Sequence, residues 1–332
     1  MRTIRFLLLA AGLVCALDAH SQNANLGTSG AQFLKLPIGA RAAGMAGAYV
    51  GLADDASAMF WNPAGIVNIK GNSVHFSHMR WFESFDVNAA SWVSNLGRAG
   101  FLGVGVLVFQ MDPMEVTTER SPEGTGLYFD AMDVAISVAY ARRLTDAFNV
   151  GLTAKYVRQQ IWNESANGLA FDVGTQYRLP FKKFTIAMTM SNFGPDLKMG
   201  GPDLNVKYDA DSYLPNRLVP TLLETESFPL PLNFEFGISM DVIDSRFFDV
   251  KAGVDAVHPN DNDERIQVGS EVSFFDRLFL RGGYKYKSDD EVFSFGVGFN
   301  AFVAGTLLHA DYAFTSYDLL PNVNRVSFGI DF

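Results

Sequence analysis

Apolar and polar side chains alternate along most of the chain, from about residue 72 to its end. A period of two is typical of a β-strand, in which successive side chains point to opposite faces. The clearest example is the stretch 232–242, where Leu, Phe, Ile, Met and Val alternate with Asn, Glu, Gly, Ser and Asp. Helical periodicity is scarce, so the pattern predicts an all-β protein.

The alternation predicts fourteen strands, an even number as in single-chain bacterial barrels. They are expected at 72–81, 85–95, 99–112, 130–142, 147–161, 168–179, 183–193, 231–243, 247–257, 265–275, 277–287, 291–302, 305–316 and 325–332. Most connections alternate between short and long, with the longest at 112–129 and 194–230. The connections at 82–84 and 288–290 are short where a long one is expected.

The polar phase of these strands distinguishes two architectures. It is rich in Gly, Ser, Asn and Asp, and charged residues make up only 19% of the chain. A soluble β-sandwich carries long charged side chains on its polar face, whereas an outer-membrane barrel turns its apolar phase to lipid and small or polar residues to its lumen. We therefore predict a transmembrane outer-membrane β-barrel of about fourteen antiparallel strands over residues 71–332, in contact with outer-membrane lipid. A soluble sandwich is the weaker alternative.

Residues 1–21 are predicted to be a cleavable signal peptide. Arg2 and Arg5 precede an apolar core of twelve residues, and small residues stand before a cleavage site at Gln22. The core is shorter than the ~20 residues that span a bilayer. Cys15, the only cysteine, lies within this peptide. The exported chain is therefore expected to lack disulfides and thiolate metal sites.

The chain ends on an alternating apolar run that contains Phe328, Ile330 and Phe332. Such an end resembles the signal by which the barrel assembly machinery of the outer membrane recognises its substrates. The alternative is an edge strand that happens to end on an aromatic residue. Together with the export signal and the strand count, the ending favours insertion by this machinery and an outer-membrane location.

Residues 22–70 lack the strand pattern and are dense in Ala and Gly. Asp54 or Asp55 is placed to cap a short helix over 56–61, which Asn62 and Pro63 would end. A barrel of fourteen strands is too wide for its own side chains to fill. We therefore predict that residues 22–70 form a plug or hatch in the lumen.

Four stretches of this region occur in the order Phe-Leu-x-Leu-Pro, Gly-Ala-Arg-Ala-Ala-Gly-Met-Ala-Gly-Ala, Ala-Asp-Asp-Ala and Trp-Asn-Pro-Ala-Gly. Together they resemble the PorV/PorQ family of outer-membrane barrels, which is linked to the type IX secretion system. They are similar, more distantly, to FadL-type long-chain fatty-acid transporters, which carry an Asn-Pro-Ala-Gly segment in an N-terminal hatch. The residues that carry the resemblance are Pro37, Gly39, Arg41, Gly44, Gly47, Asp54, Asp55, Asn62, Pro63 and Gly65.

The resemblance implies a fourteen-stranded barrel plugged by its N-terminal segment, without a catalytic site. A PorV-like member would be an accessory of type IX protein secretion that binds exported cargo, its sorting domain or components of the translocon. The FadL branch implies passive uptake of hydrophobic small molecules past the hatch. The first role is the main interpretation and the second is the alternative. The proline-rich apolar loop 194–230 suits a protein partner and a lipid-like ligand equally well.

Enzymatic and cofactor chemistry is not predicted. Motifs of zinc enzymes, serine hydrolases and dinucleotide-binding proteins are absent. His75 and His78 differ in phase and are expected on opposite faces of one strand. The loop 258–264 offers oxygen ligands for calcium, but it lacks EF-hand spacing, so a solvated loop is favoured. The net charge of −10 argues against nucleic acid as a partner.

Charged residues also occur in the phase that we expect to face the lumen. They are Lys155, Asp172, Arg178, Glu235, Asp241, Lys251, Asp255 and Glu271. They could line a polar permeation path, or they could pair with one another and with Arg41, Asp54 or Asp55 of the plug. An unpaired buried charge is costly, and the mixed signs favour pairing.

Overall fold

The computed structural model describes residues 25–209, 218–288 and 291–332. The predicted signal peptide and Cys15 lie outside these residues. Within them, no helix is long and apolar enough to span a membrane.

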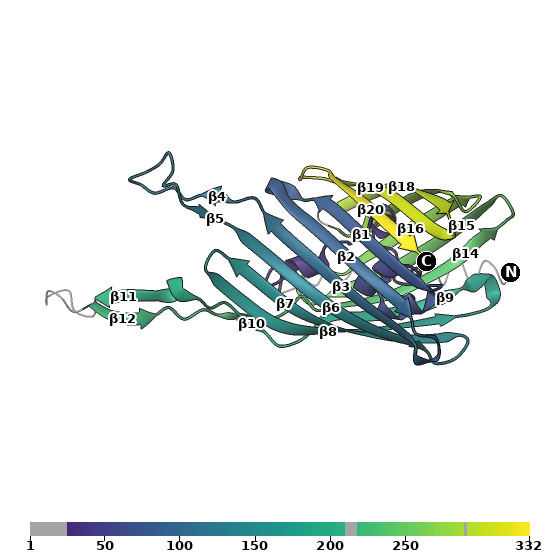
Figure 1. Cartoon of the computed structure of the whole chain (residues 1–332), viewed down its shortest axis with the longest axis horizontal. Coiled ribbons are helices and arrows are strands. Elements are labelled where there is room, and N and C mark those ends of the chain that lie inside the picture. The colour runs from purple at the N-terminus through teal and green to yellow at the C-terminus, as the bar shows by residue number, and fades with distance from the viewer. Residues whose placement is uncertain (1–24, 210–217, 289–290) are drawn as a thin grey trace, which may run out of the picture.

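Fourteen antiparallel strands form a closed barrel (Figure 1), which confirms the fold class predicted from the alternation. The first and last strands pair with each other and close the ring, with Phe76 opposite Phe328. The strands are β1 (Asn72–Arg80), β2 (Phe85–Asn95), β3 (Phe101–Met111), β6 (Ala131–Arg143), β7 (Phe148–Ile161), β8 (Glu164–Arg178), β9 (Thr185–Phe193), β14 (Asn233–Asp244), β15 (Phe248–Pro259), β16 (Arg265–Phe274), β17 (Leu278–Tyr286), β18 (Glu291–Val303), β19 (Thr306–Tyr317) and β20 (Val323–Asp331).

Most strands begin and end close to their predicted positions. Strand β8 is the main exception, because it begins at Glu164 instead of residue 168. Ile161 pairs with Glu164 across a two-residue turn, and Trp162 in this turn has a φ of 51°. The tight turn extends the pairing of β7 and β8 through a polar stretch whose alternation is too weak to predict a strand.

The two faces of the strands differ as the alternation predicts. In β20, Phe328 is 57% exposed, whereas its neighbour Ser327 is 2% exposed. The exposed phase of most other strands is likewise apolar, and the buried phase is small or polar. Because the ring is closed, the buried phase faces the lumen, and the apolar exposed phase faces outward as in a barrel surrounded by lipid.

The connections fall at two ends of the barrel, because each strand reverses direction. The long-loop end carries the connections 81–84, 112–130, 162–163, 260–264 and 318–322, together with the described parts 194–209, 218–232 and 287–288 of two further connections. The short-turn end carries 96–100, 144–147, 179–184, 245–247, 275–277 and 304–305. The chain terminus Phe332 lies at the short-turn end, where its carbonyl accepts a hydrogen bond from Asn72 N. In bacterial barrels, long loops face the cell exterior.

The two longest loops contain short hairpins that the sequence did not predict. The first loop pairs β4 (Met114–Glu115) with β5 (Tyr128–Phe129). The second pairs β10 (Leu197–Lys198) with β13 (Ser227–Phe228), and β11 (Asn205–Asp209) with β12 (Leu218–Leu222). In Figure 1 the arms that carry β4–β5 and β11–β12 extend well beyond the barrel at the long-loop end.

Residues 25–70, here called the lumen segment, run inside the barrel from one end to the other. Gly27 N donates to Asp261 O at the long-loop end, whereas residue 71 precedes β1 at the short-turn end. The segment forms η2 (Gln32–Lys35), α2 (Ala40–Gly44), η3 (Ala56–Phe60) and η4 (Pro63–Asn68). Helix α2 contacts β17–β20, η3 contacts β1–β3, and η4 contacts β6–β8. Contacts on all these sides place the segment within the ring.

The helix expected over 56–61 is present as the 3-10 helix η3. Asp55 caps it, because its Oδ1 accepts a hydrogen bond of 2.8 Å from Ser57 N. Asn62 caps the following η4, with Oδ1 accepting from Ala64 N at 3.1 Å. Both caps satisfy backbone donors that a helix start leaves without partners.

Glycine in the polar phase lets the lumen segment lie directly on the strand backbone. A Cβ at Gly151 of β7 would lie 2.3 Å from Pro63 C, and a Cβ at Gly283 of β17 would lie 2.3 Å from Met45 C. No side chain fits at such a distance. The glycine-rich lumen face is therefore what allows the close packing of this segment.

Candidate functional site

The Arg41 cluster, formed by Arg41, Asp54, Asp55, Glu271 and Arg281, ties the lumen segment to the barrel wall. Arg41 donates to Asp54 Oδ1 at 2.5 Å and to Asp55 Oδ2 at 3.0 Å. Glu271 of β16 accepts from Arg41 at 2.9 and 3.1 Å, and from Arg281 of β17 at 2.7 Å. Bidentate charge-assisted bonds of this kind are among the stronger polar contacts. The cluster thus joins α2 to two strands.

Asp55 is held in its charged form by this cluster. Burial alone would raise the pKa of its carboxyl, but the Arg41 guanidinium and hydrogen bonds from Ser57 and Tyr49 hold the pKa well below its usual value. Tyr49 donates its hydroxyl to Asp55 Oδ2 at 2.7 Å. Asp55 therefore both caps η3 and anchors α2.

Asn62 links the lumen segment to another part of the wall, strand β8. Its Nδ2 donates to Val50 O and to Thr175 O of β8, each at 3.1 Å. A Cβ at Gly174 would lie 2.1 Å from Asn62 Oδ1, so this strand position has to be glycine. Asn62 is fully buried and fastens the start of η4 to both its own segment and the barrel.

The other residues of the N-terminal motif also make close contacts. Gly39 N donates to Ser77 Oγ of β1 at 3.2 Å. A Cβ at Gly44 would lie 3.0 Å from Gly296 Cα, one at Gly47 would lie 2.8 Å from Gln267 Oε1, and one at Gly65 would lie 2.4 Å from Ala53 O. Pro63 packs against Gly151, and Pro37 lines a cavity at the long-loop end. Phe328 and Ile330, two residues of the predicted insertion signal, point outward on β20.

Several of the lumen-phase charges pair, as their mixed signs suggested. Lys155 contacts Asp172 at 2.7 Å on adjacent strands, and both side chains are buried. Lys251 lies 3.9 Å from Asp54. Asp255 accepts from Val50 N at 2.9 Å, whereas Asp241 binds Lys183 at 2.7 Å near the short-turn end. The remaining two of the eight charges are Glu235 and Arg178, and Arg178 lies at the short-turn end of β8.

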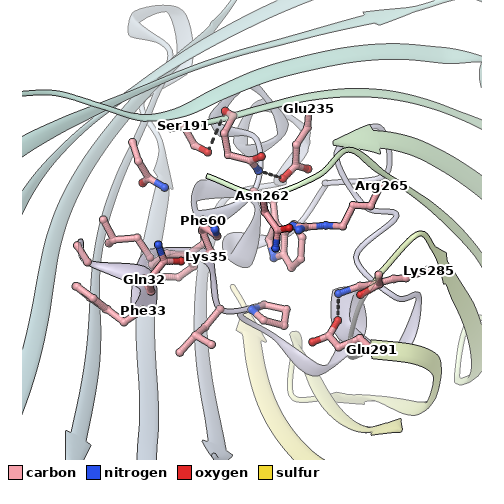
Figure 2. A pocket seen from close by; sticks show the side chains of 18 of the residues that line it. Gln32, Phe33, Lys35, Phe60, Ser191, Glu235, Asn262, Arg265, Lys285 and Glu291 are labelled. Carbon is pink, nitrogen blue, oxygen red and sulfur yellow. Dashed lines mark hydrogen bonds and ion pairs between the residues drawn. The ribbon is translucent and has the colours of Figure 1, made fainter. Parts of the chain in front are cut away.

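The mouth pocket is a cavity of about 590 Å³ at the long-loop end, between the lumen segment and the barrel wall (Figure 2). Its size is within the range of small-molecule sites, roughly 300–1,000 Å³. Aromatic side chains form part of its lining: Phe33, Phe60, Trp61, Trp81, Phe109 and Tyr317. Polar and charged side chains form another part: Gln159, Asn192, Asn233, Glu235, Arg265 and Lys285.

Ion pairs hold the rim of the mouth pocket. Lys35 Nζ contacts Asp261 Oδ1 at 2.7 Å, and Gln32 Nε2 donates to Asp261 Oδ2 at 2.5 Å. Partial burial would raise the pKa of Asp261, but the hydrogen bonds from Lys35 and Gln32 outweigh it and lower the pKa. Lys285 and Glu291 form a further pair in the wall (Figure 2).

A second, smaller cavity of about 210 Å³ lies at the short-turn end. It is lined by Arg41, Asp55, Glu271, His309 and Asp331, among others. The two cavities share no lining residue, but the lumen segment lines both of them. All five residues of the Arg41 cluster line this smaller cavity.

The sequence did not single out most of the mouth pocket. Of its polar residues only Glu235 was among the candidates, although Arg265 and Lys285 also occur near the long-loop ends of their strands. A polar phase that carries charge at the same end of several successive strands is a signal that could have found them. His75 and His78 lie on opposite faces, as their phase predicts. No cluster of three or more metal-binding side chains occurs among the described residues.

Comparison with known proteins identifies the family of this chain. The model of the uncharacterised protein family UPF0164 matches residues 10–178, just over half of the chain. The chain belongs to this family. A UPF0164 protein of Treponema pallidum is 33% identical over 86 residues, which are 26% of this chain and 22% of that protein. The match thus spans about a fifth of the relative's length.

Solved structures similar to this UPF0164 member are outer-membrane barrels of the FadL type. The CymD monoaromatic hydrocarbon channel has a TM-score of 0.55 at 14% identity, covering 89% of this chain and 98% of that one. A Pseudomonas aeruginosa FadL homologue has a TM-score of 0.53 at 12% identity, covering 90% and 98%. At these identities the likeness shows the fold. The resemblance to PorV/PorQ proteins stays a prediction.

Proposed function

We propose that this protein is an outer-membrane channel for the passive uptake of small molecules with a hydrophobic body. The observation that carries the proposal is the mouth pocket, a partly aromatic cavity of about 590 Å³ at the end where long loops face the exterior. The barrel around it is similar in fold to a monoaromatic hydrocarbon channel. Binding and diffusion need no covalent chemistry, so the protein is proposed to be a non-enzyme.

The route follows from the two cavities. A solute would enter the mouth pocket and reach the short-turn end only when the lumen segment moves and the ion pairs of the Arg41 cluster break. Arg41, Asp54 and Glu271 are bound by ion pairs and not by covalent bonds, so the contacts can break and re-form. The lumen segment acts in this proposal as the hatch that separates the two cavities.

Uptake by cells tests the channel. The full chain is expressed in a porin-deficient Gram-negative host, and entry of radiolabelled ethylbenzene, 2-phenylethylamine, 3-phenylpropionate and phenylalanine is measured. At least one probe is expected to enter several-fold faster than in cells with the empty vector. Ser191→Trp, which fills the mouth pocket, should abolish the difference, whereas Asp146→Trp, on an exposed turn at the other end, should not. Entry at the vector rate for all four probes would overturn the proposal.

A role in protein secretion is a second candidate, favoured by the two arms. Leu127 and Tyr128 of the first arm, and Leu218 and Leu222 of the second, are exposed although they are large and apolar. Apolar surface held away from the barrel suits a protein partner, such as exported cargo or a translocon component. Replacing residues 116–127 by a Gly-Ser linker would then stop secretion of sorting-domain cargo while solute uptake continues. Unchanged secretion would contradict this role.

A further inference from the structure

Glu235 and Arg265 form one row across the wall of the mouth pocket. Glu235 of β14 lies opposite Val257 of β15, and Val257 lies opposite Arg265 of β16. All three belong to the phase that faces the lumen. With strands about 4.8 Å apart, the two charged residues have backbones about 10 Å apart on one face. Figure 2 shows both side chains at the pocket.

Both side chains have a buried polar atom without a partner among the described residues. Oε2 of Glu235 accepts no hydrogen bond, and Nε of Arg265 donates none. The other Glu235 oxygen is occupied by Asn233 Nδ2 at 2.5 Å. Glu235 as a whole is only 9% exposed. A buried polar group without a partner costs free energy, so this pair is suited to a bound molecule.

Two other cations that line the mouth pocket are already paired. Lys35 binds Asp261, and Lys285 binds Glu291. Glu235 and Arg265 thus present one acceptor and one donor of opposite charge to the same cavity.

An aromatic wall stands across the barrel from this row. Trp81 follows β1 and Phe109 belongs to β3, and both line the mouth pocket. In the ring of fourteen strands, β2 and β15 are seven positions apart, which is half of the ring. One molecule in the cavity therefore meets a polar wall and an apolar wall on opposite sides.

We propose that the mouth pocket selects amphiphiles whose apolar body carries a head with both a hydrogen-bond donor and an acceptor, such as the ammonium and carboxylate of an aromatic amino acid. The donor binds Glu235, the acceptor binds Arg265, and the ring packs against Trp81 and Phe109. This inference rests on the proposed channel function and names its solute class. It separates this chain from a channel for bare hydrocarbons, which offer nothing to either charge.

Four probes that share a phenyl ring test the head group. L-phenylalanine has both groups, 2-phenylethylamine has only the donor, 3-phenylpropionate has only the acceptor, and ethylbenzene has neither. Binding to the purified full chain in detergent is followed by calorimetry against a protein-free micelle blank. Phenylalanine is expected to bind about tenfold more tightly than either single-group probe, because a charged hydrogen bond is worth at least that factor. Equal affinities, or ethylbenzene as the tightest ligand, would overturn the inference.

Two variants separate the two contacts. Glu235→Gln should weaken the binding of phenylalanine and 2-phenylethylamine about tenfold and leave that of 3-phenylpropionate unchanged. Arg265→Gln should weaken the binding of phenylalanine and 3-phenylpropionate about tenfold and leave that of 2-phenylethylamine unchanged. Glu264→Gln and Arg246→Gln, both exposed and outside the pocket lining, are the matched controls. Equal weakening of every probe would contradict the assignment. Each variant is checked for the heat-dependent gel shift of a folded barrel, and the ranking of probes on the unmodified chain tests the inference even if a variant does not fold.

The binding assay tests the amphiphile class and the uptake assay tests the channel, so the two proposals can be rejected independently. Uptake of several probes without a preference in binding would reject the amphiphile class and leave the channel intact. A clear preference in binding without uptake of any probe would reject the channel, and the pocket would then be a binding site only.

Discussion

Arg41 and Glu271 form a bidentate ion pair between the lumen segment and the barrel wall. Nε of Arg41 lies 2.9 Å from Oε2 of Glu271, and its Nη2 lies 3.1 Å from Oε1. The two residues are 230 positions apart in the chain, so their contact reports directly on the seating of the segment. In the proposed channel this pair is one of the contacts that must open for a solute to pass.

Removing the guanidinium is expected to loosen the lumen segment. Arg41→Met leaves Glu271, which is almost fully buried, with Arg281 alone. It also leaves the partly exposed Asp55 without its cation, and Asp54 with only Lys251 at 3.9 Å. The cost is about 3 kcal/mol, at the low end for a broken buried pair because two of the partners reach water. Hydrogen exchange of residues 40–56 should quicken, and conductance in planar bilayers should rise. Arg98→Met, on an exposed turn, should change neither.

Two neighbouring glycines of β17 test the close packing of the segment. Gly283→Ala places a Cβ 2.3 Å from Met45 C, whereas Gly282→Ala points to open space. We expect Gly283→Ala to destabilise the barrel by about 1–3 kcal/mol through overpacking, and Gly282→Ala to have little effect. The measurement is the temperature at which the folded band is lost on a denaturing gel. Equal temperatures for the two variants would show that the segment does not press on β17.

The buried pair of Lys155 and Asp172 predicts a large effect of a single substitution. Lys155→Met leaves the carboxylate of Asp172 without its cation, at a cost of about 3–5 kcal/mol. The double variant Lys155→Met with Asp172→Asn should recover much of this loss, because no unpaired charge remains. Urea unfolding of the protein in lipid vesicles gives both values. A double variant less stable than the single one would contradict the pair.

Acid should release the start of the lumen segment from the rim. Asp261 has a folded pKa below its ordinary value of 3.8, so its contribution to stability is present above that value and is lost as the pH falls through the folded pKa. Hydrogen exchange of residues 25–36 should therefore quicken below about pH 3.8 and stay slow at pH 5. Asp261→Asn should remove most of this pH dependence, whereas Asp263→Asn, exposed on the same loop, should retain it.

The sequence by itself determined the strands and their faces. The alternation over 232–242 reappears as β14, with Phe234 outward and Asn233 and Glu235 inward. A period of two is a local property, since each side chain is assigned to a face by its two neighbours. The cap of η3 could be narrowed to Asp54 or Asp55 for the same reason, because a cap depends on residues two or three positions away. Asn62 was expected only to end that helix, and its cap on η4 was not predicted.

The tertiary structure alone decided where the candidate site lies. Phe109, Glu235 and Arg265 stand on separate strands and Trp81 directly follows another, and closure of the ring is what brings them around one cavity. The same closure sets Arg41 against Glu271. Such contacts depend on register and on which strands become neighbours or opposites in the ring, and no short stretch of sequence encodes that. Alternation could therefore predict that Glu235 faces the lumen, but only the folded barrel could show that its free oxygen shares a pocket with Arg265 and an aromatic wall.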